Sequence, residues 1–145
     1  MTDDAALRRL LADRDLGVLV TIKKDGRPQL SNVNYHYDED RALIRVSVTD
    51  DRAKARNLSR DPRASLHVTT PTGAAYVVAE GTAELSPVAR DLDDAAVEEL
   101  IEVYRDVRRE EHPDWDDYRR AMVADGRRVV RLRVERLYGY APPSA

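Results

Sequence analysis

The sequence predicts a mainly β fold of the α+β class, an antiparallel β-barrel with helices at its edges. Six stretches of the chain have the alternating or extended character of strands. They do not alternate regularly with helices, as the strands of a parallel sheet do. Gly81 interrupts the fifth stretch, where we expect the bulge or sharp bend that a barrel needs. The chain has 145 residues, the usual size of one domain, so we expect a single domain over residues 1–145.

The first third of the chain reads as a helix followed by three strands. Residues 2–14 place leucines on one face, and Thr2 is the expected N-cap of this helix. The run GVLVTIK at 17–23 alternates, and KDGRP then supplies the Asp-Gly turn of a hairpin. The second strand is PQLSNVNYHYD at 28–38, and the third is ALIRVSV at 42–48.

The rest of the chain contains three more strands and two helices, besides a basic stretch. RASLHV at 63–68 and AAYVVAEGTAEL at 74–85 are the fourth and fifth strands. Residues 91–109 have helical spacing of apolar side chains, with acids at the front and arginines at the back. A shorter helix is expected at 114–126, and RRVVRLRVERLYGY at 127–140 alternates as the sixth strand.

The composition excludes several classes of protein. The chain has no cysteine, which rules out disulfide bonds and thiolate chemistry and fits a reducing cytoplasm. No stretch has the length of a membrane span, and the acidic start lacks the order of a secretory signal, so we expect a cytoplasmic protein. The three histidines, His36, His67 and His112, lack ligand spacing, so no metal site is expected. With 27 acids against 24 Lys and Arg, a nucleic-acid-binding function is not expected either.

The stretch DRAKARNLSRDPR at 51–63 has an unfavourable distribution of charge. If Asp51 opens a helix, Arg52 and Lys54 fall in its first turn, where the helix dipole disfavours cations. The other predicted helices follow the dipole rule, with acids leading. A bound phosphate or carboxylate would supply the missing negative charge, and the Ser47 hydroxyl would add a donor.

A second interpretation of this stretch stays open on the pattern alone. The cations then form a solvated basic face that is balanced by the nearby acids Asp50, Asp51 and Asp61. Arg60 and Arg63 are assigned to such a solvent-facing surface in either case. No Walker motif and no GxGxxG motif occurs, so a phosphate would be held by side chains rather than by a glycine-rich loop. The polar strand SNVNYHYD is equally ambiguous, since it suits an edge strand or a ligand-lining one.

Four segments together resemble one known family. They are GVLVTIKKDGRPQLSNVNYHYD at 17–38, VSVTDDRAKARNLSRDPRASL at 46–66, AAYVVAEGTAEL at 74–85, and HPDWDDYRRAMVADGRRVVRLRVERLYGYAP at 112–142. The sequence resembles the split-barrel flavin and deazaflavin oxidoreductases related to pyridoxamine 5'-phosphate oxidase. The resemblance is closest to the actinobacterial F-420-dependent branch.

The resemblance implies a six-stranded split β-barrel of the FMN-binding type. It also implies a homodimer with cofactor sites between the subunits. The cofactor phosphate would lie against Arg52 and Lys54, with Ser47 and Val48 beside them and Arg56 as an auxiliary. The remaining expected cofactor-binding residues, along the ring and at another wall, are Gln29, Ser31, Asn32, Val33, Ala74, Ala75 and Tyr76.

The function implied is a reductase that uses coenzyme F-420 and passes a hydride to an electron-poor small molecule such as an enone or quinone. An FMN-dependent oxidoreductase is the alternative within enzymes, and a non-catalytic flavin or deazaflavin carrier is the alternative outside them. The terminal ERLYGYAP lacks the family's substrate-phosphate arginine and histidine pattern, so oxidation of vitamin B6 is not expected. No catalytic residue is assigned. Tyr35, His36 and Tyr37 lie near the expected ring strand, and solvent is an equally good proton donor.

Overall fold

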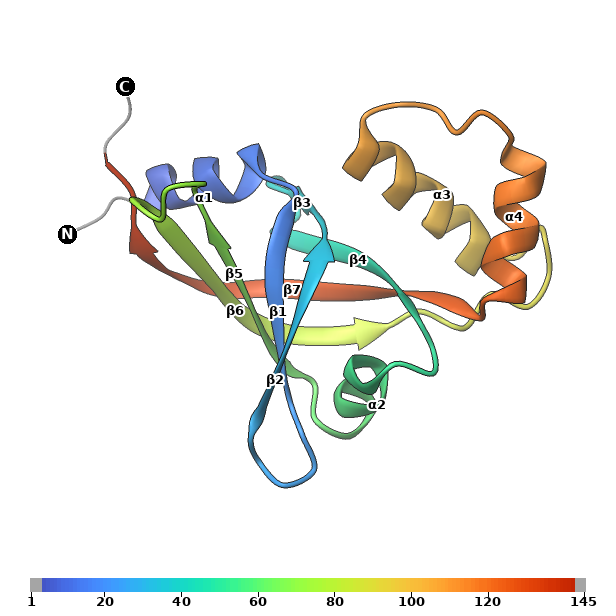
Figure 1. The fold of residues 1–145 in the computed structure, drawn as a ribbon, viewed down its shortest axis with the longest axis horizontal. Helices are drawn as coiled ribbons and strands as arrows, with labels where there is room; N and C mark the ends of the chain where they lie inside the picture. Colours follow the sequence, from blue (N-terminus) through green and yellow to red (C-terminus); the bar gives the residue numbers. More distant parts are fainter. Residues whose placement is uncertain (1–3, 143–145) are drawn as a thin grey trace.

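The computed structural model describes residues 4–142, and the expected N-cap Thr2 lies outside them. Its strands form one antiparallel sheet that curls into a barrel, with the helices at its edges (Figure 1). This confirms the predicted fold class. In chain order the elements are α1 (Asp4–Asp13), β1 (Leu16–Ile22), β2 (Pro28–Asn34), β3 (His36–Asp38), β4 (Leu43–Thr49), α2 (Ala53–Arg60), β5 (Arg63–Thr69), β6 (Tyr76–Leu85), α3 (Ala95–Arg108), α4 (Trp115–Ala124) and β7 (Arg127–Tyr140).

The described residues contain seven strands, whereas the sequence predicts six. The order in the sheet is β2-β1-β5-β6-β7-β4-β3. The predicted second strand, 28–38, is divided at Tyr35 into β2, which pairs with β1, and β3, which pairs with β4. The two ends of the sheet are therefore consecutive in the chain, and this single bent segment brings them together. Counting β2 and β3 as one strand restores the expected six.

Tyr35 marks the point where the chain leaves one edge of the sheet for the other. Its side chain is fully buried, and its hydroxyl donates to the carbonyl oxygen of Leu11 at 2.6 Å. Its backbone N–H donates to the carbonyl of Asp15. Helix α1 thus closes one end of the barrel, where Leu7 and Leu11 are buried. The break in the strand follows from these contacts rather than from a turn residue.

Gly81 lies at the irregularity in the pairing of β6 with β7, where the register shifts between Glu80 and Gly81. This confirms the predicted bulge. A Cβ atom at this position would lie 1.8 Å from the carbonyl oxygen of Arg133. The close approach of the two backbones explains why a glycine is needed there.

The helices α3 and α4 pack against each other at one side of the barrel (Figure 1). Their buried side chains form a hydrophobic cluster with Val129 of β7, and this cluster is distinct from the one inside the barrel. Asp94 is the N-cap of α3 and accepts from the backbone N–H of Val97, so the helix begins later than the predicted residue 91. No helix within residues 4–142 is long and apolar enough to cross a membrane.

Candidate functional site

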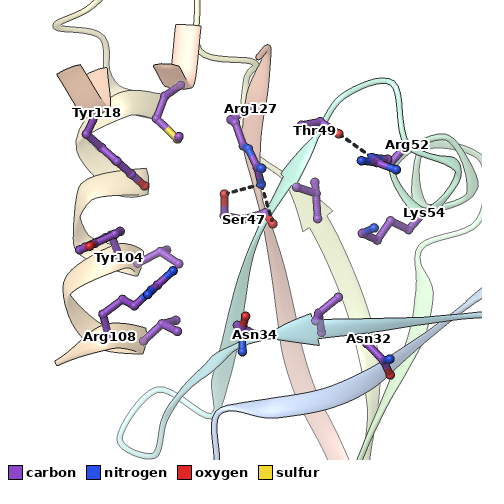
Figure 2. A pocket seen from close by; sticks show the side chains of 15 residues that line it. Asn32, Asn34, Ser47, Thr49, Arg52, Lys54, Tyr104, Arg108, Tyr118 and Arg127 are labelled. Carbon is purple, nitrogen blue, oxygen red and sulfur yellow. Dashed lines mark hydrogen bonds between the residues drawn. The ribbon is translucent and has the colours of Figure 1, made fainter. Parts of the chain in front are cut away.

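A cleft of about 570 Å³ lies between the barrel, the start of α2 and the α3–α4 pair. Figure 2 shows helices α3 and α4 along one side, β4 in the middle and α2 on the other side. Polar side chains come mainly from the barrel and α2, and apolar side chains come mainly from the helices. The cleft is lined by Asn32, Val33, Asn34, Ser47, Val48, Thr49, Arg52, Lys54, Val103, Tyr104, Val107, Arg108, Tyr118, Met122 and Arg127.

The start of α2 carries cations and no acid in its first turn. Its N-cap is Arg52, one residue later than the expected Asp51, and no side chain caps it. The Nε of Arg52 donates to the Thr49 hydroxyl at 3.2 Å. Lys54 follows within the first turn and also lines the cleft. The backbone N–H groups of this helix end and the two cations therefore favour an anion at the same place.

The acids that were expected to balance this basic stretch form no ion pair with Arg52 or Lys54 among the described residues. Asp50 accepts from the Nη1 of Arg128 at 2.7 Å, and Asp61 pairs with Arg63 at the same distance. The Nη1 of Arg56 donates to a backbone carbonyl, that of Asp51. The front of the stretch therefore keeps an unbalanced positive charge, which favours the anion-site interpretation there, whereas Arg63 at its end is balanced within the stretch.

Arg127, at the first position of β7, adds a third cation to the side of the cleft formed by the barrel and α2. Its Nη1 lies 3.4 Å from the Ser47 hydroxyl oxygen, and its Nε is buried without a hydrogen-bond partner in the described structure. We call Arg52, Lys54 and Arg127 the cation cluster. Burial lowers the pKa of Lys54, and the nearby charges of Arg52 and Arg127 lower it further. The three charges are thus electrostatically coupled.

Sequence reasoning missed Arg127, because it opens a strand in which arginines recur at short intervals. Nothing in the pattern separates it from Arg128 or Arg131. Both of those side chains form ion pairs, with Asp50 and with Glu84 and Glu99. The distinguishing signal is the missing acidic partner, which only the tertiary structure reveals.

The opposite side of the cleft is aromatic. Tyr104 of α3 contacts the rings of Trp115 and Tyr118 edge-on, with centroids 5.5 and 5.2 Å apart. The Tyr118 hydroxyl donates to the Leu100 carbonyl oxygen at 3.1 Å, and burial raises its pKa to about 12. Arg108 lies over the Tyr104 ring at 5.5 Å. This side offers a largely apolar, aromatic surface with a cation at its edge.

The structure separates the predicted residues of β2. Asn32 and Val33 line the cleft, whereas Gln29 and Ser31 do not. Ser31 lies opposite the buried Leu19 in the pairing with β1. Gln29 lies near a second, smaller cleft beside the hairpin. Since successive side chains of a strand point to opposite faces, Asn32 points away from the face that Gln29, Ser31 and Val33 share.

Asn57 of α2 joins Gln29 to a buried hydrogen-bond network. Its Nδ2 donates to the Thr21 hydroxyl at 3.0 Å and to the Gln29 Oε1 at 2.9 Å. Its Oδ1 accepts from Arg60, which also donates to the Ile22 carbonyl. Arg60, expected to face water only, is therefore one of the side chains that anchor α2 to the hairpin.

Asn57→Ala is expected to destabilise the protein by about 1 to 3 kcal/mol, because it leaves buried partners unpaired. Asn57 is 5% exposed, so water cannot easily replace the lost contacts. Urea unfolding followed by circular dichroism measures this loss. Ser59→Ala, at an exposed position of the same helix, serves as the control. Equal stabilities of the two variants would contradict the anchoring role.

The three predicted residues Ala74, Ala75 and Tyr76 lie away from the cleft of their own chain. Ala74 and Ala75 end the turn between β5 and β6, and Tyr76 begins β6 opposite Tyr140. The Tyr76 ring stacks on His67, with centroids 5.7 Å apart. None of the three lines the cleft within residues 4–142.

None of the three side chains considered as proton donors lines the cleft. Tyr35 is buried under α1, and burial together with the Asp15 carboxylate raises its pKa. Tyr37 is also buried, and burial raises its pKa too. The Nδ1 of His36 lies 3.8 Å from Asp106, on the outer side of β3.

Three solved structures share this fold over most of the chain. An F420 reductase is 21% identical, with a TM-score of 0.66 over 90% of this chain and 94% of that one. A conserved hypothetical protein from Mycobacterium tuberculosis is 22% identical, with a TM-score of 0.74 over 97% of this chain and 85% of that one. A heme binding protein from Mycobacterium smegmatis is 23% identical, with a TM-score of 0.68 over 100% of this chain and 57% of that one.

The sequence itself matches one protein family. The profile described as pyridoxamine 5'-phosphate oxidase matches residues 3–141. This range includes the whole barrel, the inserted helices and every residue of the cation cluster. Because the match extends over nearly the entire chain and the strands form the expected split barrel, the chain belongs to the pyridoxamine 5'-phosphate oxidase family.

Proposed function

We propose that this protein is an oxidoreductase that binds coenzyme F-420 and reduces an electron-poor small molecule, such as an enone or a quinone. The observation that carries the proposal is the cation cluster, which has no acidic partner among the described residues and lies in a cleft with an apolar aromatic side. A phosphorylated cofactor with a flat ring matches both halves of this surface. The similar F420 reductase supports the choice of cofactor.

Different residues of the cleft would contact different parts of the cofactor. Arg52, Lys54 and the start of α2 would hold the phosphate through charge-assisted hydrogen bonds. Ser47 and Val48 lie at the end of β4 beside them, and Asn32 and Val33 would border the ring. Hydride transfer to the acceptor is the chemistry that F-420 supplies when bound. The chain's own residues would orient the partners, and the aromatic side would keep water away.

We further propose that the protein works as a homodimer. An outward row of the sheet runs through Asn32, Val18, His67, Val78 and Tyr138 in successive pairings. Leu16 and Leu30 beside it are 55% and 62% exposed. This face is continuous with the cleft at Asn32, so a second copy covering it would lie next to the cofactor.

In such a dimer, the end of the sheet that carries Ala74, Ala75 and Tyr76 belongs to the same outward face. Tyr76, Tyr138 and Tyr140 are all exposed there. These side chains would then reach a cleft only from a second copy. Analytical ultracentrifugation of the purified protein tests the dimer, and a monomer at all concentrations would contradict it.

The cofactor assignment is tested by titrating the protein separately with F-420, FMN and hemin, following fluorescence quenching or absorbance. We expect micromolar or tighter binding of F-420. Tighter binding of FMN would make the protein an FMN-dependent oxidoreductase. Binding of hemin alone would contradict the proposal, and binding of none would refute a cofactor role.

If F-420 binds, turnover distinguishes an enzyme from a carrier. The reduced cofactor is mixed with a panel of enones and quinones, and its oxidation is followed by absorbance. Turnover of one class identifies the acceptor chemistry. A complete lack of turnover across the panel would favour a protein that only stores or carries the cofactor.

The affinity for the anionic cofactor is expected to fall with rising pH, through the lowered pKa of Lys54. A bound anion stabilises the ammonium form and so raises this pKa relative to the free protein. Affinity is therefore full below the free-protein value and declines as the pH rises above it. Fluorescence titrations across the alkaline range measure the decline. Lys54→Arg, whose charge does not titrate there, should remove it, and an unchanged profile would contradict this role.

A further inference from the structure

Arg127 differs from the neighbouring arginines of β7 in having no carboxylate partner among the described residues. Arg128 donates to Asp50 at 2.7 Å and to the Ser86 carbonyl at 2.8 Å. Arg131 pairs with both Glu84 and Glu99. Arg127 has only the carbonyl and hydroxyl oxygens of Ser47, at 3.5 and 3.4 Å. These distances are long for a guanidinium, which forms shorter bonds with a good acceptor.

The side chain is nevertheless half-buried, and its Nε lacks a partner in the described structure. A buried donor without an acceptor destabilises a protein, and a buried charge without a counter-charge does so more strongly. Figure 2 shows the guanidinium directed toward Ser47, into the middle of the cleft. A partly buried guanidinium that lines a cleft and has no carboxylate partner suits an anionic ligand there.

The backbone places Arg127 across from the start of α2. In the pairing of β4 with β7, Arg127 lies opposite Thr49, whose hydroxyl accepts from the Nε of Arg52. The Asp50 N–H donates to the Gly126 carbonyl at 2.9 Å, which ties the loop before α2 to the start of β7. With its backbone held by this hydrogen bond, Asp50 accepts from Arg128 through its carboxylate. One loop therefore aligns two cations of the cluster and removes the nearest acid from it.

We propose that Arg127 is a direct ligand of the bound anion, and that the cation cluster selects a ligand whose phosphate end carries at least two negative charges. Such a group is a phosphomonoester, or a phosphodiester with a carboxylate beside it. This inference rests on the proposed function and names an additional binding residue and the charge of its ligand.

The charge of the ligand follows from the composition of the site. The salt bridges of the described residues include none to Arg52, Lys54 or Arg127. Arg108 lines the same cleft at its helical edge, so a monoanion would leave at least two like charges uncompensated in a partly buried cleft, where their repulsion is weakly screened. A dianion compensates most of the charge and offers enough oxygens for three cationic donors.

Two small probes test the inference without any cofactor. Methyl phosphate is a dianionic monoester at mildly alkaline pH, and dimethyl phosphate is a monoanionic diester. Their binding is measured by isothermal titration calorimetry, or by chemical-shift changes for weak complexes. The wild-type protein is expected to bind methyl phosphate more tightly. Arg127→Gln should weaken that binding about tenfold or more, the range for loss of a charge-assisted hydrogen bond.

Arg136→Gln is the matched control, because it removes the same charge from an exposed position of the same strand. Its affinity for methyl phosphate should equal that of the wild type. Thermal unfolding of both variants verifies that they fold. Arg127→Lys keeps the charge but loses the planar donor arrangement. Its affinity for methyl phosphate should lie between those of the wild type and Arg127→Gln.

Wild-type affinity of Arg127→Gln for methyl phosphate would overturn the inference, and so would equal wild-type binding of the two probes. If Arg127→Gln behaves as wild type while the protein still binds F-420 or FMN, the inference fails and the proposed function stands. If methyl phosphate binds through Arg127 but neither cofactor binds, the proposed function fails and the anion site stands.

Discussion

Replacement of both Arg52 and Lys54 with alanine is expected to weaken the binding of F-420 or FMN by roughly 2 to 5 kcal/mol. Both side chains line the cleft, and no acidic side chain of the described residues compensates them there. Binding is expected to weaken because the variant loses two charge-assisted contacts to one phosphate. Fluorescence titration of the variant and the wild type measures the difference.

The control for this variant is the pair Arg9→Ala and Lys24→Ala. Both positions are exposed and lie outside the cleft, so the net charge changes equally. Their replacement should leave the affinity within experimental error. If the two double variants bind the cofactor equally well, the start of α2 is an ordinary basic surface.

Gly81→Ala is expected to destabilise the protein by about 3 kcal/mol or more. The added Cβ would lie 1.8 Å from the Arg133 carbonyl oxygen and 2.9 Å from its carbon. These are backbone atoms inside the sheet, which cannot move aside as a flexible side chain does. The pairing of β6 with β7 would therefore have to open at the bulge. Chemical denaturation measures the free energy of unfolding.

Gly26→Ala provides the comparison for this steric effect. Gly26 has a φ of 91° in the hairpin turn, and no other atom lies within 4 Å of an added Cβ. Gly26→Ala should therefore destabilise the protein only through the unfavourable backbone conformation, by about 1 kcal/mol. A smaller loss for Gly81→Ala than for Gly26→Ala would show that the two backbones are not in close contact.

Local chemistry made much of the fold predictable. The Asp-Gly turn, the alternation of the strands and the apolar spacing of α3 depend on neighbours in the sequence, and the structure contains all of them. The bulge at Gly81 was predictable because a glycine inside a strand often marks a bulge or a close approach of two backbones. The break at Tyr35 was not, because no Gly or Pro marks it. Its cause is long-range: Tyr35 donates to the carbonyls of Leu11 and Asp15 at the point where the chain changes pairing partner from β1 to β4.

In the candidate site too, the features that depend on neighbours in the sequence were predictable, and those that depend on tertiary contacts were not. The wrong-signed charge at the start of α2 is a local anomaly, and it led to Arg52 and Lys54 from the sequence alone. Arg127 is anomalous only in relation to Asp50, which is far away along the chain and bonded to Arg128. The helical side of the cleft, with Tyr104 and Tyr118, was hidden for a similar reason. Its apolar residues read as ordinary helix packing.

The separate hydrophobic cluster of α3 and α4 makes the two sides of the cleft structurally independent. The cation cluster is anchored in the barrel and α2, whereas the aromatic side of the cleft comes from helices with their own buried residues. Substitutions at Tyr104, Val107 or Met122 would reshape the helical side of the cleft while leaving the cation cluster in place. One side of the cleft can therefore change its shape without any change in the elements that carry Arg52, Lys54 and Arg127.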